Sequence, residues 1–200
     1  MIRLLGTIDI NLEKITKVMR TFVRSNTDGL SSDSWRNSQI KMFTELGMSE
    51  TQISNWREYT ESVTGYDQHN TTSEVFTKFL EKLLGEDFFK HNDCLPKIEY
   101  WRIQEQKPGH ITLPHVDLHE SVTLKNNTNK KDLLRLWIPM EDAKFGQAFF
   151  VGDEVIHRFK AGEIYDWDDE MHTGVNAGFD NRYTLLVYIR KNQSDVAMEQ

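Results

Sequence analysis

Leu133-Leu-Arg-Leu-Trp-Ile-Pro-Met140 and Arg182-Tyr-Thr-Leu-Leu-Val-Tyr-Ile189 are apolar runs whose length and content of β-branched and aromatic residues are typical of buried strands. Shorter runs of the same kind lie before and between them, at 97–103, 148–151, 155–159, 163–167 and 172–175. Turn-forming pairs such as Gly152-Asp153 and Ala161-Gly162 separate these runs. Many short strands, with a turn about every eight to twelve residues, predict a barrel or jelly roll.

The first 96 residues have a different period. Three stretches carry apolar residues at helical spacing: Leu12 to Val23, Trp35 to Leu46 and Val75 to Leu84. Ser49-Glu-Thr-Gln52 has the pattern of a capping box and predicts the start of one more helix. We therefore expect an α+β fold with a mainly β core. One domain would span residues 1–190, with 1–96 as helical support, 97–190 as the β core and 191–200 as a polar tail.

Composition narrows the possible settings and partners. The chain has 200 residues, 38% of them hydrophobic, which is enough for one sizeable core. A net charge of −7 argues against nucleic acid as a partner, because phosphate binding needs a concentrated basic surface. The single cysteine, Cys94, excludes an internal disulfide and suits a reducing compartment. No run is long and apolar enough to span a bilayer and nothing resembles a signal peptide, so we expect a cytoplasmic protein.

His115, Asp117 and His172 are the candidate metal ligands. In an extended segment, side chains two residues apart point to the same side, so His115 and Asp117 would share a face. A His-x-Asp pair alone is weak evidence, but here His172 follows in a second predicted strand. Two imidazoles and one carboxylate form the ligand set of non-haem Fe(II) oxygenases, which leaves positions open for other ligands.

Arg182 lies ten residues beyond His172, at the start of a predicted strand. The segment Gly174–Asn181 between them is rich in turn formers, so we expect His172 and Arg182 on neighbouring antiparallel strands. A guanidinium beside a metal site offers a bidentate, permanently charged partner for a carboxylate. The combination predicts an iron site whose cosubstrate is a 2-oxo acid, with Arg182 holding its far carboxylate. The alternative for Arg182 is a surface ion pair.

Several motifs together resemble the aspartyl/asparaginyl β-hydroxylase branch of the Fe(II)/2-oxoglutarate oxygenases, which also contains bacterial hydroxylases of free proline. They are Pro108-Gly-His-Ile-Thr-Leu-Pro-His115-Val-Asp117, Leu134-Arg-Leu-Trp-Ile-Pro139, Gly162-Glu-Ile-Tyr-Asp-Trp-Asp168, His172-Thr-Gly-Val-Asn176 and Arg182-Tyr-Thr-Leu-Leu-Val187. The resemblance covers residues 97–190. It implies a double-stranded β-helix, a cupin-like jelly roll, with iron inside its open end.

The resemblance also implies an activity: hydroxylation of an amino acid, free or within a peptide or protein, with 2-oxoglutarate and O2 consumed and succinate and CO2 formed. Arg135 matches an arginine that in this branch helps to hold 2-oxoglutarate near the metal. Trp137 shares a predicted face with Arg135, so we group both with Arg182 as candidate cosubstrate-binding residues. Some members of the branch lack the carboxylate ligand, whereas Asp117 is present here. The proline hydroxylases continue well beyond the barrel, so their substrate pocket is not carried over.

Two other functions fit the same residues. One is a cupin-like metal enzyme that does not use 2-oxoglutarate, and the other is a non-catalytic sensor that binds a metal or a 2-oxo acid. The sequence fixes neither the substrate nor the oligomeric state. The polar segment 120–132, with almost no apolar anchor, is either a lid that orders over the iron or a plain connection between strands. The acidic residues Asp166, Asp168, Asp169 and Glu170 are either a solvated loop or a group that attracts a cation.

Overall fold

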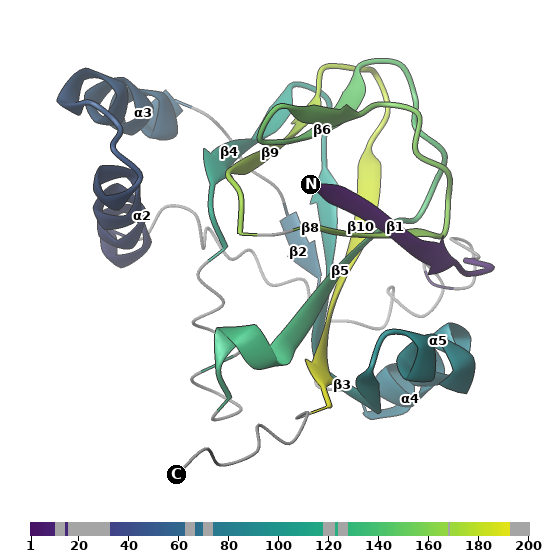
Figure 1. Cartoon of the computed structure of the whole chain (residues 1–200). Coiled ribbons are helices and arrows are strands. Elements are labelled where there is room, and N and C mark those ends of the chain that lie inside the picture. The colour runs from purple at the N-terminus through teal and green to yellow at the C-terminus, as the bar shows by residue number, and fades with distance from the viewer. Residues whose placement is uncertain are drawn as a thin grey trace, which may run out of the picture.

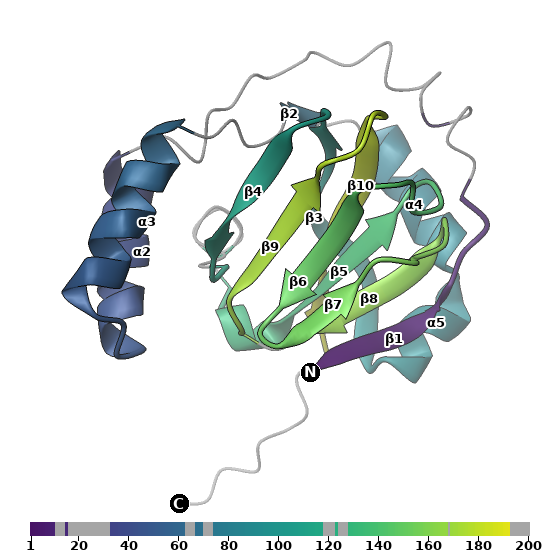
Figure 2. The ribbon, with the colours of Figure 1, turned by 90° about the horizontal axis from the view of Figure 1, so that it is seen from above.

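The computed structural model describes residues 1–10, 15, 33–62, 67–69, 74–117, 123, 128–167 and 169–192, and its β core consists of two antiparallel sheets that face each other. The larger sheet has six strands, in the order β1 (Ile2–Thr7), β8 (Glu163–Trp167), β5 (Leu133–Pro139), β10 (Arg182–Lys191), β3 (Cys94–Gln106) and β2 (Asp67–His69). The smaller sheet has four, in the order β4 (His110–His115), β9 (His172–Asn176), β6 (Gln147–Val151) and β7 (Glu154–Ile156). Figure 2 shows the two sheets as the layers of a flattened barrel.

The strand order defines the fold. From β3 to β10 the chain passes back and forth between the sheets: β3, β5, β8 and β10 belong to the larger one, and β4, the consecutive pair β6 and β7, and β9 belong to the smaller one. Each sheet therefore receives four of these eight strands, and every pairing between them is antiparallel. This arrangement is a double-stranded β-helix, as the sequence predicts.

In the part of the chain that the structure describes, four α-helices of a turn or more lie outside the two sheets (Figure 1): α2 (Asp33–Glu45), α3 (Glu50–Ser62), α4 (Glu74–Leu84) and α5 (Glu86–His91). Helices α4 and α5 cover the outer face of the larger sheet, where both contact β3. Helices α2 and α3 form a hairpin on the other side of the barrel, beside β4. The predicted capping box begins α3, because the Gln52 side chain accepts a hydrogen bond from the Ser49 N–H and the Ser49 hydroxyl accepts one from the Gln52 N–H.

Strand β5, in the middle of the larger sheet, is buried on both faces, which explains its nearly continuous apolar run. Leu134, Leu136 and Ile138 face α4 and α5 and belong to the main core. Trp137 points the other way, into a second cluster with Phe149 and Trp167 that fills part of the space between the sheets. Since strand side chains alternate, Arg135 shares the inner face with Trp137, as the sequence predicts.

One prediction about the pairing of strands was wrong. His172 and Arg182 lie in different sheets, because β9 pairs with β4 and β6 whereas β10 pairs with β3 and β5. The turn-rich segment 177–181 crosses from one sheet to the other instead of closing a hairpin, as jelly-roll connections do. Strand β2, which none of the sequence patterns above predicts, adds an edge strand to β3.

Other predictions fall on residues that the structure does not describe. They are most of the helix expected at 12–23, of which only the buried Ile15 is described, and residues 193–200 of the tail. Within the described ranges, no helix has both the length and the apolar character that crossing a membrane requires.

Candidate metal centre and cosubstrate pocket

The three predicted metal ligands meet between the two sheets. His115 ends β4 and lies opposite His172 at the start of β9, and a register shift between Thr112 and His115 brings these two residues into line. Asp117 follows two residues later and carries its carboxylate to the same point. One ligand atom from each side chain lies within 4.8 Å of the others. The Asp117 carboxylate oxygens are 3.6 Å from His115 Nε2 and 3.3 Å from His172 Nε2.

Both imidazoles are held by a main-chain carbonyl. His115 Nδ1 lies 2.6 Å from the Leu113 carbonyl oxygen, and His172 Nδ1 lies 3.1 Å from that of Glu170. A carbonyl only accepts, so each ring donates through Nδ1–H and turns the lone pair of Nε2 toward Asp117. Burial lowers the pKa of His115 to about 4, and the charges of Arg102 and Arg135 act in the same direction. His115 is therefore neutral at neutral pH, which is the form that binds metal.

These atoms fit a divalent ion. Two ligands about 2.1 Å from one ion and at right angles to each other are about 3 Å apart, close to the separations between Asp117 and the two imidazoles. The carboxylate also forms an ion pair with Arg135, whose guanidinium lies over the Trp167 ring at 3.9 Å from its centroid. An ion bound by Asp117 would share this carboxylate with Arg135.

Arg182 points into the barrel from the start of β10 and is 5% exposed. Its Nη1 donates to the carbonyl oxygens of Ala148 at 2.8 Å and Val175 at 3.5 Å, and no carboxylate of the described residues pairs with it. Burial without a counter-ion lowers the pKa of Arg182 to about 9, so the guanidinium keeps its charge at neutral pH at an energetic cost. The surface ion pair considered from the sequence is thereby excluded.

Gly174 makes room for this guanidinium. A Cβ at position 174 would lie 2.3 Å from Arg182 Nη2, a separation that real side chains do not show. In the sequence Gly174 stands out only as one of several turn formers, although a glycine inside a strand often marks a close approach of another group.

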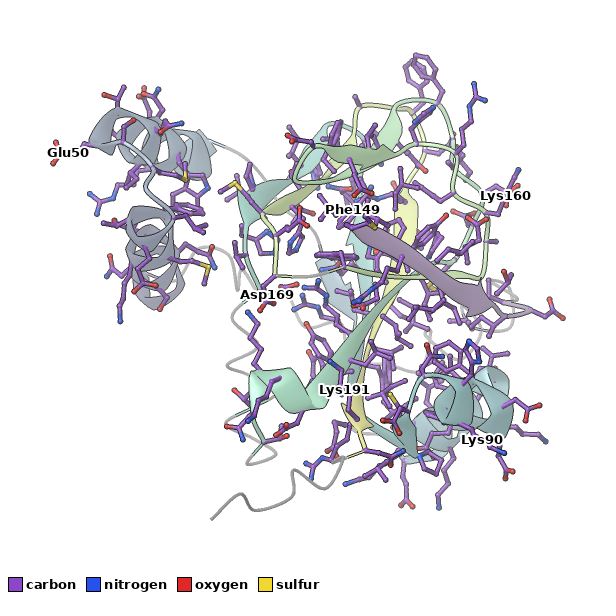
Figure 3. All side chains as sticks on the ribbon, viewed as in Figure 1. Glu50, Lys90, Phe149, Lys160, Asp169 and Lys191 are labelled. Atoms are coloured by element: carbon purple, nitrogen blue, oxygen red, sulfur yellow. The ribbon has the colours of Figure 1, made fainter. Side chains whose placement is uncertain are left out.

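One cavity joins the metal centre to Arg182. Its volume is about 20 Å³, and its apolar wall is formed by Trp137, Phe149, Trp167 and Leu186. Figure 3 shows Phe149 among the side chains packed beneath β6. The polar lining of the cavity comprises His115, Asp117, His172 and Arg182 together with Arg102, Gln104 and Thr112. Sequence reasoning missed these last three. The only signal was that Arg102 and Gln104 alternate with the core residues of β3.

The remaining candidate residues from the sequence, Arg135, Trp137 and the acidic residues before His172, do not form one site. Arg135 does not line the cavity, whereas Trp137 does. The acidic group is not one cation site among the described residues: Asp166 is buried against Arg3, and Asp169 forms an ion pair of 2.8 Å with Lys130. Asp169 lies at the edge of the barrel near the short 3-10 turn Lys130–Asp132 (Figure 3). Asp168 and most of the segment 120–132, to which the lid and connector alternatives refer, lie outside the described residues.

Comparisons with known proteins give only distant likenesses. No protein-family model matches the chain, and no curated protein matches it. Among solved structures, a viral collagen prolyl hydroxylase from Paramecium bursaria Chlorella virus-1 is 16% identical over 64% of this chain and 80% of that chain, with a TM-score of 0.46. A prolyl-4-hydroxylase from Pseudomonas putida is 14% identical over 90% and 98%, with a TM-score of 0.39. A cupin barrel protein from Salinispora arenicola is 16% identical over 44% and 60%, with a TM-score of 0.30. The fold therefore rests on the strand order of this chain itself.

Proposed function

We propose that this protein is an Fe(II)/2-oxoglutarate-dependent oxygenase that hydroxylates an amino acid, free or within a peptide or protein. The observation that carries the proposal is Arg182. It is a buried guanidinium without a carboxylate partner among the described residues, and it opens into the same cavity as His115, Asp117 and His172. An unpaired buried charge is costly, and a dicarboxylate bound between the metal and Arg182 would remove that cost.

Each residue has a defined part in binding. His115 and His172 would hold Fe(II) through Nε2, with their rings fixed by the carbonyls of Leu113 and Glu170, and Asp117 would supply the third ligand. Arg182 would bind the far carboxylate of 2-oxoglutarate. When bound, Fe(II) and 2-oxoglutarate together supply the activation of O2 for insertion of oxygen into a C–H bond, with succinate and CO2 as the other products.

The aromatic residues of the apolar wall contribute in a different way, by keeping water away from the site. Trp137, Phe149 and Trp167 are each less than 5% exposed and line the cavity, and the rings of Phe149 and Trp167 pack beside that of His172. Such a wall excludes water from the reacting groups and strengthens electrostatic contacts inside the site. The motifs at residues 97–190 resemble those of the aspartyl/asparaginyl β-hydroxylase branch, and on that resemblance we propose that the chain belongs to this branch.

Succinate release tests the proposal. The Fe(II)-loaded protein should form succinate from 2-oxoglutarate in air, and the rate should rise with the right member of a panel of amino acids and peptides. The His172→Ala variant is the matched control and should form none. A wild-type protein that binds iron yet forms no succinate with any panel member would support the cupin-like or sensor alternatives.

A further inference from the structure

The segment that carries two of the candidate ligands leaves the sheet between them. Strand β4 ends at His115, so the next residue, Val116, has no partner strand. Val116 is only 2% exposed, and water therefore cannot satisfy its N–H and C=O groups. Buried main-chain groups without partners are rare because each costs about as much as a lost hydrogen bond.

Gln39 of α2 provides both missing partners. Its Nε2 donates to the Val116 carbonyl oxygen at 2.9 Å, and the Val116 N–H donates to Gln39 Oε1 at 3.2 Å. A carboxamide has a donor and an acceptor side by side, so it can replace the edge of a neighbouring strand. Gln39 is itself fully buried, although it precedes Val116 by 77 residues.

Helix α3 makes a second attachment one residue before the ligand pair. The Trp56 indole Nε1–H donates to the Pro114 carbonyl oxygen at 2.9 Å. The Trp56 ring meets the buried Phe43 ring edge to face, with centroids 5.0 Å apart, so the two helices hold the indole in place. Gln39 and Trp56 thus hydrogen-bond to the main chain on both sides of His115, at Val116 and Pro114. The α2–α3 hairpin that carries them stands beside the barrel next to β4 (Figures 1 and 2).

We propose that the α2–α3 hairpin positions the metal ligands, with Gln39 as the principal positioning residue and Trp56 as its support. The inference rests on the proposed metal centre. The Val116 peptide joins His115 to Asp117, so its rotation would swing the Asp117 carboxylate relative to both imidazoles. Gln39 fixes that rotation without touching the metal. Removing a group that orients a metal ligand without binding the metal itself typically weakens metal binding about ten- to a hundredfold.

Four proteins test the inference, with Co(II) as the metal and its visible absorption as the readout. Gln39→Met keeps the volume and the helix propensity but removes both hydrogen bonds. Trp56→Phe keeps an aromatic ring against Phe43 but removes the indole donor. Gln52→Ala is the control, because it removes the Gln52 side-chain half of the capping box of α3 and destabilises the same hairpin without touching Val116. Wild type is the fourth.

We expect Gln39→Met to bind Co(II) about ten- to a hundredfold more weakly, with an altered absorption spectrum. Trp56→Phe should show a smaller change in the same direction. Gln52→Ala should lower the melting temperature yet keep the wild-type Co(II) affinity and spectrum. If Gln39→Met does not fold, Trp56→Phe against Gln52→Ala decides the question.

The inference is overturned if the Gln39 and Trp56 variants bind Co(II) like wild type. It is also overturned if Gln52→Ala weakens Co(II) binding as much as they do, since the hairpin would then act through stability alone. Failure of the wild-type protein to bind Co(II) would instead remove the metal centre, and with it the proposed function.

Discussion

Replacing Gly174 with alanine should weaken 2-oxoglutarate binding without removing a single polar group. The new Cβ would lie 2.3 Å from Arg182 Nη2 and 3.3 Å from Arg182 Cζ. Ordinary contact begins at about 3.4 Å, so one of the two must move by about 1 Å. Gly174 lies within β9, where the main chain is held by β4 and β6, whereas the guanidinium is the end of a flexible side chain. Arg182 is therefore the group that moves.

The size of the effect follows from the contact that is lost. A hydrogen bond to a charged group contributes about 1.5–3 kcal/mol. Loss of one such bond to the far carboxylate should raise the dissociation constant for 2-oxoglutarate about ten- to a hundredfold. The measurement is isothermal titration of 2-oxoglutarate into the anaerobic, Fe(II)-loaded variant. Iron content should stay at the wild-type level, because Gly174 does not touch His115, Asp117 or His172.

A double-mutant cycle supplies the control. Arg182→Ala alone should weaken binding at least as much as Gly174→Ala, and adding Gly174→Ala to it should cost nothing further, because the two changes act on one contact. The reasoning is refuted if Gly174→Ala binds 2-oxoglutarate like wild type, or if it weakens binding equally with and without Arg182.

Three further outcomes are expected from the same structure. His172→Ala should lose bound iron and all succinate formation, as measured by metal analysis and product assay; full iron occupancy in this variant would contradict the assignment. Unfolding of the metal-free protein should become easier as the pH falls from about 6.5 toward 4: the unfolded chain binds a proton at His115 that the folded chain resists, so up to about 3 kcal/mol of stability is lost in that window. Denaturant titrations should show this loss in wild type and a smaller one in His115→Asn, and identical pH profiles would count against it. Leu136→Ala, at a fully buried position of the main core, should lower the free energy of unfolding by about 2–5 kcal/mol in the same titrations, and a change below about 1 kcal/mol would be inconsistent with its burial.

Most of the fold could be predicted from the spacing of the apolar residues along the sequence. Alternation along β5 separates Leu134 and Leu136 from Arg135 and Trp137, and the structure uses the two groups on opposite faces of one sheet. The spacing of His115 and Asp117 likewise predicts their common direction, because the chain stays extended there.

The failures share a physical cause, which is that local pattern does not specify the partner strand. A turn-rich segment between His172 and Arg182 fits a hairpin and a crossing between sheets equally well, and only packing of the whole barrel chooses the crossing. Gln39 was missed for the same reason. Nothing near it in sequence indicates that its carboxamide would complete the main chain at Val116, 77 residues away. Arg182 could be predicted as a carboxylate partner, but its lack of a counter-ion among the described residues is visible only in three dimensions.

The most direct test of the proposed function is anaerobic addition of 2-oxoglutarate to the Fe(II)-loaded protein, followed by visible absorption. We expect a new absorption band that needs both Fe(II) and 2-oxoglutarate. It should be absent from His172→Ala and should need much more 2-oxoglutarate to appear in Arg182→Ala. If the wild-type protein binds Fe(II) with no spectral change at saturating 2-oxoglutarate, or if Arg182→Ala titrates like wild type, the pocket does not hold this cosubstrate in the way proposed.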